Sequence, residues 1–186
     1  AQVGLFKVTD GIWQLRGFDI ANMTLIEGQT GFIVVDPLTA RESASAALAF
    51  ARKHLGDKPV SAIVFTHSHV DHFGGALGVA SAQELAQRKI PVIAPEGFIE
   101  EATSENVLVG TAIARRSMYQ FGKNLERSPK GNVDTGLGKN VAYGAIGVLM
   151  PTQLITTPEQ ELVIDGVRFV FHNVPGAEAP AELTFS

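Results

Sequence analysis

Hydrophobic and polar positions alternate in short runs over the first part of the chain. Residues 5–8 and 12–15 are two such runs, and Asp10-Gly11 lies between them. Residues 23–27 and 32–35 form a second pair around a Gly-Gln-Thr-Gly sequence. Asp-Gly and other glycine-containing turns between hydrophobic runs are typical of β-hairpins. We therefore expect the chain to begin with two antiparallel strand pairs.

A helix and then a buried strand are predicted next. Thr39 followed by Glu42 has the spacing of a capping box, in which the two side chains bond free N–H groups at a helix N-terminus. The alanine-rich segment that follows should be helical to about Leu55, with Gly56 as its C-terminal stop. Residues 60–65 are almost wholly apolar, which indicates a strand covered on both faces.

The remaining segments alternate between helix, strand and loop. We expect helix to about Arg88, a short strand over residues 90–94, helix over 98–121 with a break near Gly110, a hairpin over 161–164 and 167–171, and a further strand from 183. Residues 122–147 are rich in Gly, Asn and Ser, which is typical of a functional loop or a linker. This order predicts an α/β layered sandwich with a mixed sheet rather than a doubly wound parallel fold.

Composition and charge narrow the class of protein. The 186 residues are 45% hydrophobic and 18% charged, a balance typical of one folded domain. A net charge of −4 gives no electrostatic reason to expect nucleic acid or an anionic membrane as a partner. No apolar run is long enough for a transmembrane segment, and no leader opens the chain, so any secretory signal is expected to be absent or removed. Because cysteine is absent, a metal site must use His, Asp and Glu.

Three of the five histidines lie within six positions, after the predicted buried strand. His67 and His69 alternate, and Asp71 and His72 follow directly. Imidazole nitrogen and carboxylate oxygen are suitable ligands for zinc and related divalent ions. Alternate residues of a turning loop can face one ion while the next pair reaches a second, as in two-metal hydrolytic sites. A polar loop whose histidines only cap strand ends is the alternative, and the clustering favours metal.

The residues 66–72, Thr-His-Ser-His-Val-Asp-His, resemble the signature of the metallo-β-lactamase superfamily, and Asp36-Pro37 at a strand end is similar to that superfamily. Residues 175–182, Pro-Gly-Ala-Glu-Ala-Pro-Ala-Glu, resemble a segment of the alkylsulfatases, which hydrolyse alkyl sulfate esters such as dodecyl sulfate. Further stretches similar to that family are residues 106–110, 115–116, 119–122 and 136–139. The resemblance therefore covers nearly the whole chain.

The resemblance implies an αββα sandwich with mixed β-sheets, incomplete in this chain. Residues 1–186 would be the N-terminal part of the catalytic domain, without the dimerisation and C-terminal domains of the family. The full-length family protein would be a homodimer, and a periplasmic or secreted location is slightly favoured. Whether this chain alone hydrolyses a substrate is left open.

The resemblance also implies a two-zinc site. His67, His69, Asp71 and His72 would be ligands, and Asp71 is the candidate catalytic residue. Most superfamily members have a histidine after Pro-Gly where this chain has Ala177. In the alkylsulfatases a glutamate has this role, so Glu178 is expected to complete the first metal site. Glu182 is given no role.

The implied reaction is attack of a metal-activated water on the ester, with release of sulfate and an alcohol. Arg115 and Tyr143 are the candidates for binding the sulfate, chosen from a larger set of polar residues that includes Arg116, Lys139, Asn132 and Asn140. Leu108, Met118, Tyr119 and Phe121 are candidates for an alkyl groove, although ordinary helix packing explains them as well. The alternatives are another hydrolase of the superfamily, which Ala177-Glu178 disfavours, and a non-catalytic metal-binding fragment.

Overall fold

The structure is a computed structural model that describes residues 2–186. Its larger sheet contains seven strands in sequence order: β1 (Gly4–Thr9), β2 (Ile12–Arg16), β3 (Met23–Glu27), β4 (Phe32–Val35), β5 (Val60–Val64), β6 (Val92–Pro95) and β7 (Gln153–Ile155). Strands β1 to β4 pair antiparallel and β4 to β7 pair parallel. The expected strand pairs and mixed sheet are confirmed.

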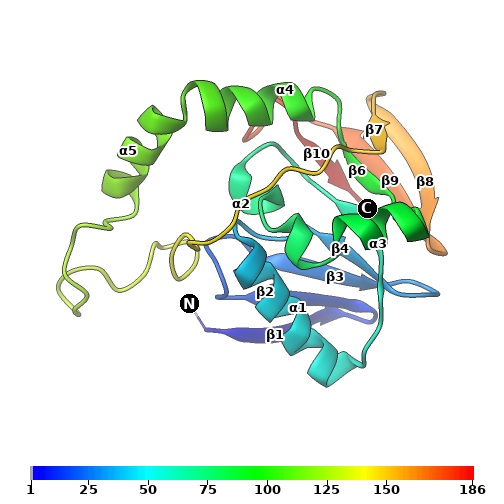
Figure 1. Ribbon diagram of the computed structural model, residues 1–186, viewed down its shortest axis with the longest axis horizontal. Coiled ribbons are helices and arrows are strands. Elements are labelled where there is room, and N and C mark those ends of the chain that lie inside the picture. Colours follow the sequence, from blue (N-terminus) through cyan, green and yellow to red (C-terminus); the bar gives the residue numbers. More distant parts are fainter. Residues whose placement is uncertain (1) are drawn as a thin grey trace.

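A second, three-stranded antiparallel sheet packs against one face of the larger sheet (Figure 1). It consists of β8 (Glu159–Ile164), β9 (Val167–Asn173) and β10 (Leu183–Phe185), in the order β10-β9-β8. Ile33 and Val64 of the larger sheet share a buried cluster with Phe169 and Phe171 of β9. The outer face of the small sheet is solvent-exposed within the described residues, as the 69% exposed Val163 demonstrates.

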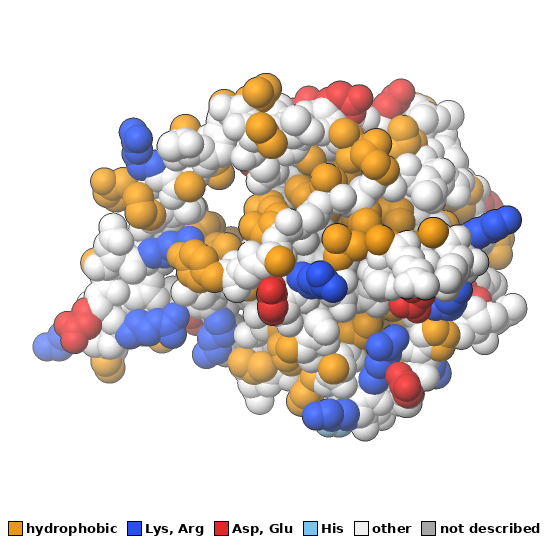
Figure 2. All heavy atoms as spheres, in the orientation of Figure 1, with side chains coloured by type: hydrophobic (Ala, Val, Ile, Leu, Met, Phe, Trp, Pro, Cys, Tyr) orange, Lys and Arg blue, Asp and Glu red, His pale blue; other side chains and the backbone are white. Residues whose placement is uncertain are grey.

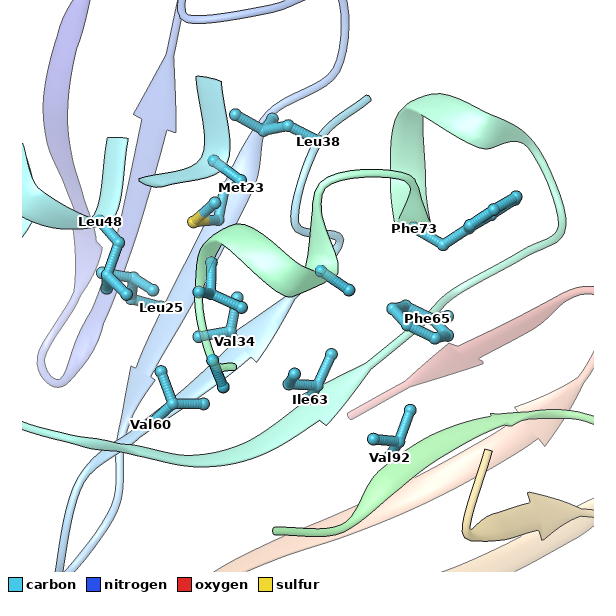
Figure 3. Packing of buried hydrophobic residues seen from close by; sticks show 14 of the residues in the cluster. Met23, Leu25, Val34, Leu38, Leu48, Val60, Ile63, Phe65, Phe73 and Val92 are labelled. Carbon is cyan, nitrogen blue, oxygen red and sulfur yellow. The ribbon is translucent and has the colours of Figure 1, made fainter. Parts of the chain in front are cut away.

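Helices cover the other face of the larger sheet. They are α1 (Arg41–Leu55), α2 (Val70–Phe73), the 3₁₀ turn η1 (Ala76–Gly78) and α3 (Ala82–Arg88). Figure 3 shows Val34 and Ile63 of the sheet packed in the same core as Leu48 of α1 and Phe73 of α2. Because neighbouring side chains of β4 point to opposite faces, Val34 enters this core and Ile33 enters the core between the sheets. The doubly covered central strands and the layered α/β sandwich are confirmed.

The predicted helix over 98–121 is divided into three pieces: α4 (Phe98–Thr103), the π-helical turn η2 (Ser104–Leu108) and α5 (Gly110–Gln120). Residues 121–152 contain no helix or strand. Helix α5 and the first part of this segment form an arm extending from the body of the molecule (Figure 1), and the later part returns to the body, where Gly147 N–H donates to Gly74 O at 2.9 Å. Within the described chain, no helix is both long and apolar enough to cross a membrane.

The capping box predicted at Thr39 and Glu42 is wrong. Helix α1 has Ala40 at its N-cap and no side-chain capping bond. Glu42 Oε2 instead accepts the N–H of Ala145 at 2.9 Å, and Arg41 N–H donates to Ala145 O at 2.8 Å. A segment about a hundred residues away therefore packs over the helix start and takes the place of the local cap.

Candidate metal centre

Residues 66–69, here called the histidine loop, follow the carboxyl end of β5 at the edge of the larger sheet. His67 and Ser68 are 3% and 1% exposed. Leu183 N–H donates to Thr66 O at 2.8 Å, and His67 forms an isolated antiparallel bridge with Glu182. The loop is therefore attached to both sheets, which limits the movement of the side chains that it presents.

Three donor atoms converge beside this loop. His67 Nε2 lies 3.1 Å from His69 Nδ1 and 4.0 Å from Glu178 Oε1, and His69 Nδ1 lies 3.7 Å from the same carboxylate oxygen. The three donor atoms all lie within 4.8 Å of one another. Two imidazoles and one carboxylate match the three protein ligands of a catalytic zinc site with an open position. The residues present therefore fit a divalent metal ion.

Asp71 and His72 form a second pair of donors on the short helix α2. His72 Nε2 lies 3.4 Å from Asp71 Oδ2, and the ring centroids of His67 and His72 are 3.9 Å apart. The structure thus places the four residues of the sequence motif in one region with Glu178, and their role as metal ligands stays a prediction. The described residues form one three-donor group, with the Asp71–His72 pair next to it.

The loop between β9 and β10 holds Glu178 at the centre. Glu182, which had no predicted role, accepts the backbone N–H groups of Glu178 and Ala179 through its Oε2. Gly176 has a φ of 79° and so adopts a backbone conformation that glycine tolerates best. Glu182 therefore shapes the loop, while Glu178 presents its carboxylate to the two imidazoles.

Asp36 also belongs to this centre, although its contacts were not predicted from the sequence. It follows β4 directly, with a φ of 54°, and its side chain accepts Thr66 N–H at 2.9 Å and Thr66 Oγ1–H at 2.7 Å. It also lies 2.8 Å from His72 Nδ1. Since β4 and β5 are parallel neighbours, their carboxyl ends meet at one edge. In the sequence, Asp36-Pro37 at the end of a predicted strand was the feature that could have pointed to this residue.

Burial and hydrogen bonding shift the pKa values at this centre in different directions. Burial and the nearby His72 lower the pKa of His67. Burial alone would also lower the pKa of His72, but its hydrogen bonds to Asp36 and Asp71 outweigh burial and raise this pKa to about 10. For Asp71, the hydrogen bond and charge of His72 exceed the opposing effect of burial, so its pKa is lowered. Asp71 is therefore ionised at neutral pH, the form in which a carboxylate can bind a metal ion.

A cavity of about 460 Å³ opens beside the three donors. His69 and Glu178 line it on one side, and Arg116 and Phe121 line it on the arm side. Glu105 of η2 is also in the wall, 3.5 Å from His69 Nε2, and burial raises the pKa of its carboxyl. Glu105 had no predicted role. It is one of several acidic residues in the predicted helix over 98–121, and nothing in the sequence distinguishes it from the others.

The predicted sulfate-binding residues lie elsewhere in this structure. Tyr143 is 76% exposed and has the Lys123 ammonium 4.9 Å from its ring centroid. Arg115 is exposed and, like Tyr143, does not line the cavity beside the donors. Of the four residues suggested for an alkyl groove, Phe121 lines this cavity, whereas Leu108, Met118 and Tyr119 are exposed.

The two-sheet sandwich and the histidine centre define the class of protein. The model of the metallo-beta-lactamase superfamily matches residues 16–173, and the chain belongs to this superfamily. Solved metallo-beta-lactamases have the same fold: one from Pontibacter korlensis gives a TM-score of 0.57 at 15% identity, covering 99% of this chain and 66% of its own.

Within the superfamily, the chain is similar to alkylsulfatases. An alkyl/aryl-sulfatase of Saccharomyces cerevisiae is 46% identical over 180 residues, covering 97% of this chain and 28% of the yeast protein. A linear primary-alkylsulfatase of Pseudomonas sp. is 44% identical over 182 residues, covering 98% of this chain and 27% of its own. The solved stereoselective inverting sec-alkylsulfatase of Pseudomonas sp. gives a TM-score of 0.93 at 43% identity, covering 99% and 29% of the two chains. This chain therefore spans less than a third of the length of these relatives.

Proposed function

We propose that this chain contributes the metal centre of a hydrolase that cleaves linear alkyl sulfate esters into inorganic sulfate and an alcohol. The observation that carries the proposal is the convergence of His67, His69 and Glu178 within 4.8 Å. A glutamate after Pro-Gly-Ala is the alkylsulfatase form of this centre. Ala177, where most of the superfamily has histidine, argues against a lactamase or a thioester hydrolase.

We assign zinc as the metal, with two ions in the complete enzyme. His67, His69 and Glu178 would hold one ion, and Asp71 with His72 would contribute to the second. When bound, such ions generate a nucleophile from water at neutral pH and stabilise charge on the reacting oxygens. Asp71, the proposed catalytic residue, keeps an ionised carboxylate at this position, which can accept a hydrogen bond from the attacking water.

The cavity beside the donors is the proposed substrate site. Arg116 supplies a guanidinium in its wall, and Phe121 supplies an apolar surface. A guanidinium binds the oxygens of sulfate through charge-assisted hydrogen bonds. Arg115 and Tyr143 stay candidates for the sulfate through the family resemblance, with Arg116 better placed in this structure.

The larger assembly is part of the same proposal. Residues 1–186 would form the N-terminal part of the catalytic domain, and the complete protein would be a homodimer. The chain matches 27% to 28% of the curated relatives' length, which supports its being part of a longer protein.

The test is sulfate release from octyl and dodecyl sulfate below their micellar concentrations. For the complete enzyme that contains this chain, we expect zinc-dependent release that is lost in the His67→Ala, His69→Ala double variant, because two of three donors are removed. Cleavage of a β-lactam or a thioester without sulfate release would contradict the substrate assignment. Zinc binding without hydrolysis of any of these compounds would support a non-catalytic metal-binding fragment instead.

A further inference from the structure

Each histidine of the metal centre has one ring nitrogen directed at the donors and one directed away. For His67, the remote Nδ1 lies 2.9 Å from Thr66 Oγ1, which in turn donates to Asp36 at 2.7 Å. For His72, the remote Nδ1 lies 2.8 Å from the same Asp36 carboxylate. One carboxylate therefore orients both rings, in the first case through a hydroxyl group.

His69 is oriented the other way and has a different partner. Its Nδ1 faces the centre, 3.1 Å from His67 Nε2 and 3.7 Å from Glu178 Oε1. Its Nε2 lies 3.5 Å from Glu105 Oε1. Because the lone pairs of the two ring nitrogens point away from each other, Glu105 faces the side of His69 turned away from the three-donor group, of which it is not a member. Its position fits an orienting group rather than a ligand.

The π-helical turn η2 sets the position of Glu105. Val109 N–H donates to Ser104 O at 3.1 Å, an i to i+5 bond, and Asn106 Nδ2 donates to Ala102 O at 2.8 Å. Such π-turns are rare in proteins, and many of those that do occur lie at functional sites. The side chain of Glu105 is 27% exposed, so the widened turn directs a carboxylate into the wall of the site.

The helix before this turn is fixed to the same core as the histidine loop. The ring of Phe98, the first residue of α4, lies 5.1 Å from Phe65 and 5.3 Å from Phe73, centroid to centroid. Phe65 precedes the histidine loop and Phe73 ends α2. The aromatic cluster therefore holds Glu105 and His69 in register with each other.

Metal-ligating histidines usually donate their second N–H to a carboxylate, carbonyl or water, which fixes the tautomer and the orientation of the ring.

We propose that Glu105 is a positioning residue that accepts the Nε2–H of His69 and so presents His69 Nδ1 to the metal ion. This inference rests on the proposed metal centre and extends it to a residue outside the ligand set. It assigns the three histidines two orienting carboxylates, Asp36 from β4 and Glu105 from η2.

The experiment compares the zinc affinity of the parent chain with Glu105→Ala, Glu105→Gln and the control Glu100→Gln, by competition with a chromophoric chelator. Glu100 is an exposed acidic residue of the same helical segment, so its variant matches the change in charge. We expect Glu105→Ala to weaken zinc binding roughly 10- to 100-fold. Glu105→Gln should lose less, because its amide oxygen still accepts the N–H, and Glu100→Gln should match the parent.

A second readout separates positioning from general loss of structure. In ¹⁵N NMR of the zinc-loaded parent, His69 should be protonated at Nε2 and bound to the metal through Nδ1. In Glu105→Ala, His69 should no longer be restricted to this one tautomer. Equal zinc affinity and an unchanged His69 tautomer in Glu105→Ala would overturn the inference while leaving the metal centre intact. No zinc binding by the parent would overturn the metal centre itself, and the inference with it.

Discussion

At the scale of single residues, His72 lies between two carboxylates. Its Nδ1 is 2.8 Å from Asp36 Oδ2, and its Nε2 is 3.4 Å from Asp71 Oδ2. These contacts overcome the effect of burial and raise the pKa of His72 to about 10. Without a metal ion the ring is therefore protonated at neutral pH, and an ion that binds at Nε2 must displace a proton.

This pKa predicts how the stability of the metal-free chain depends on pH. The folded-state pKa of about 10 lies above the unfolded value of 6.5. The contribution of His72 is therefore fully present below pH 6.5 and is lost as the pH rises through 10. We expect the free energy of unfolding to fall over this window, at most by roughly 1.4 kcal/mol per pH unit. Urea unfolding in the presence of a chelator measures it.

The control for this pH dependence is His54→Gln, since His54 is an exposed histidine of α1. Its unfolding free energy should follow the parent's pH profile, whereas His72→Gln should give a flatter profile. Parallel profiles for the parent and His72→Gln would contradict the role given to the two carboxylates.

At the scale of elements, the sequence predicted what local patterns determine. The hydrophobic runs and the Asp-Gly turn correctly indicated β1 and β2, and Gly56 correctly marked the end of α1. The capping box failed because Ala145, far away in sequence, occupies the start of α1. Strand β7 was missed because its three residues, Gln-Leu-Ile, form too short a run to show a period.

The same distinction applies to the site. His67, His69, Asp71 and His72 are adjacent in sequence, so their spacing alone revealed them. Asp36 and Thr66 meet only because β4 and β5 are parallel neighbours. Glu105 meets His69 only because α4 packs on Phe65 and Phe73. Such contacts depend on tertiary structure that the spacing of residues in the chain does not contain.

Helix α2 depends on the two glycines that follow it. A Cβ atom at Gly75 would lie 2.3 Å from Pro37 O, 2.7 Å from Ala40 O and 2.8 Å from Ala44 Cβ. We expect Gly75→Ala to destabilise the chain by about 1–3 kcal/mol, because the backbone must shift to remove these overlaps. The shift should also move Asp71 and His72 and weaken metal binding. Denaturant midpoints and zinc titration measure the two effects.

The matched control for this substitution is Gly110→Ala, at the start of α5. There the nearest atom to an added Cβ is Glu105 O at 3.8 Å, an ordinary contact. This variant should be as stable as the parent or slightly more stable, because alanine favours helix. Equal denaturant midpoints for Gly75→Ala and Gly110→Ala would show that α2 tolerates the added methyl group.

On the scale of the whole molecule, the metal centre lies where separate layers meet. The carboxyl ends of β4 and β5 supply Asp36 and the histidine loop, and the loop before β10 supplies Glu178. The arm beyond η2 forms the remaining wall. Val107, Leu108 and Tyr119 of the η2–α5 region are 73%, 77% and 82% exposed, and Figure 2 shows hydrophobic side chains interspersed with Lys and Arg side chains along this arm. The body of the molecule is thus well packed, whereas the arm exposes apolar surface.

This arrangement predicts unequal zinc binding by the chain. His67, His69 and Glu178 form a group of three donors, whereas Asp71 and His72 form a pair. A site with three protein ligands binds zinc more tightly than one with two, and protonated His72 must also lose its proton first. We therefore expect isothermal titration with zinc at pH 7 to give one tight binding event and a second event at least tenfold weaker.

Single substitutions assign the two events to their donors. Glu178→Gln should weaken the tight event strongly, because a neutral amide is a poor zinc ligand. Glu182→Gln should have a smaller effect, since its amide oxygen can still accept the N–H groups of Glu178 and Ala179. Asp71→Asn should abolish the weak event and leave the tight one in place. Two events of equal affinity in the parent, or loss of the tight event in Asp71→Asn, would show that the donors are grouped differently from the arrangement in this structure.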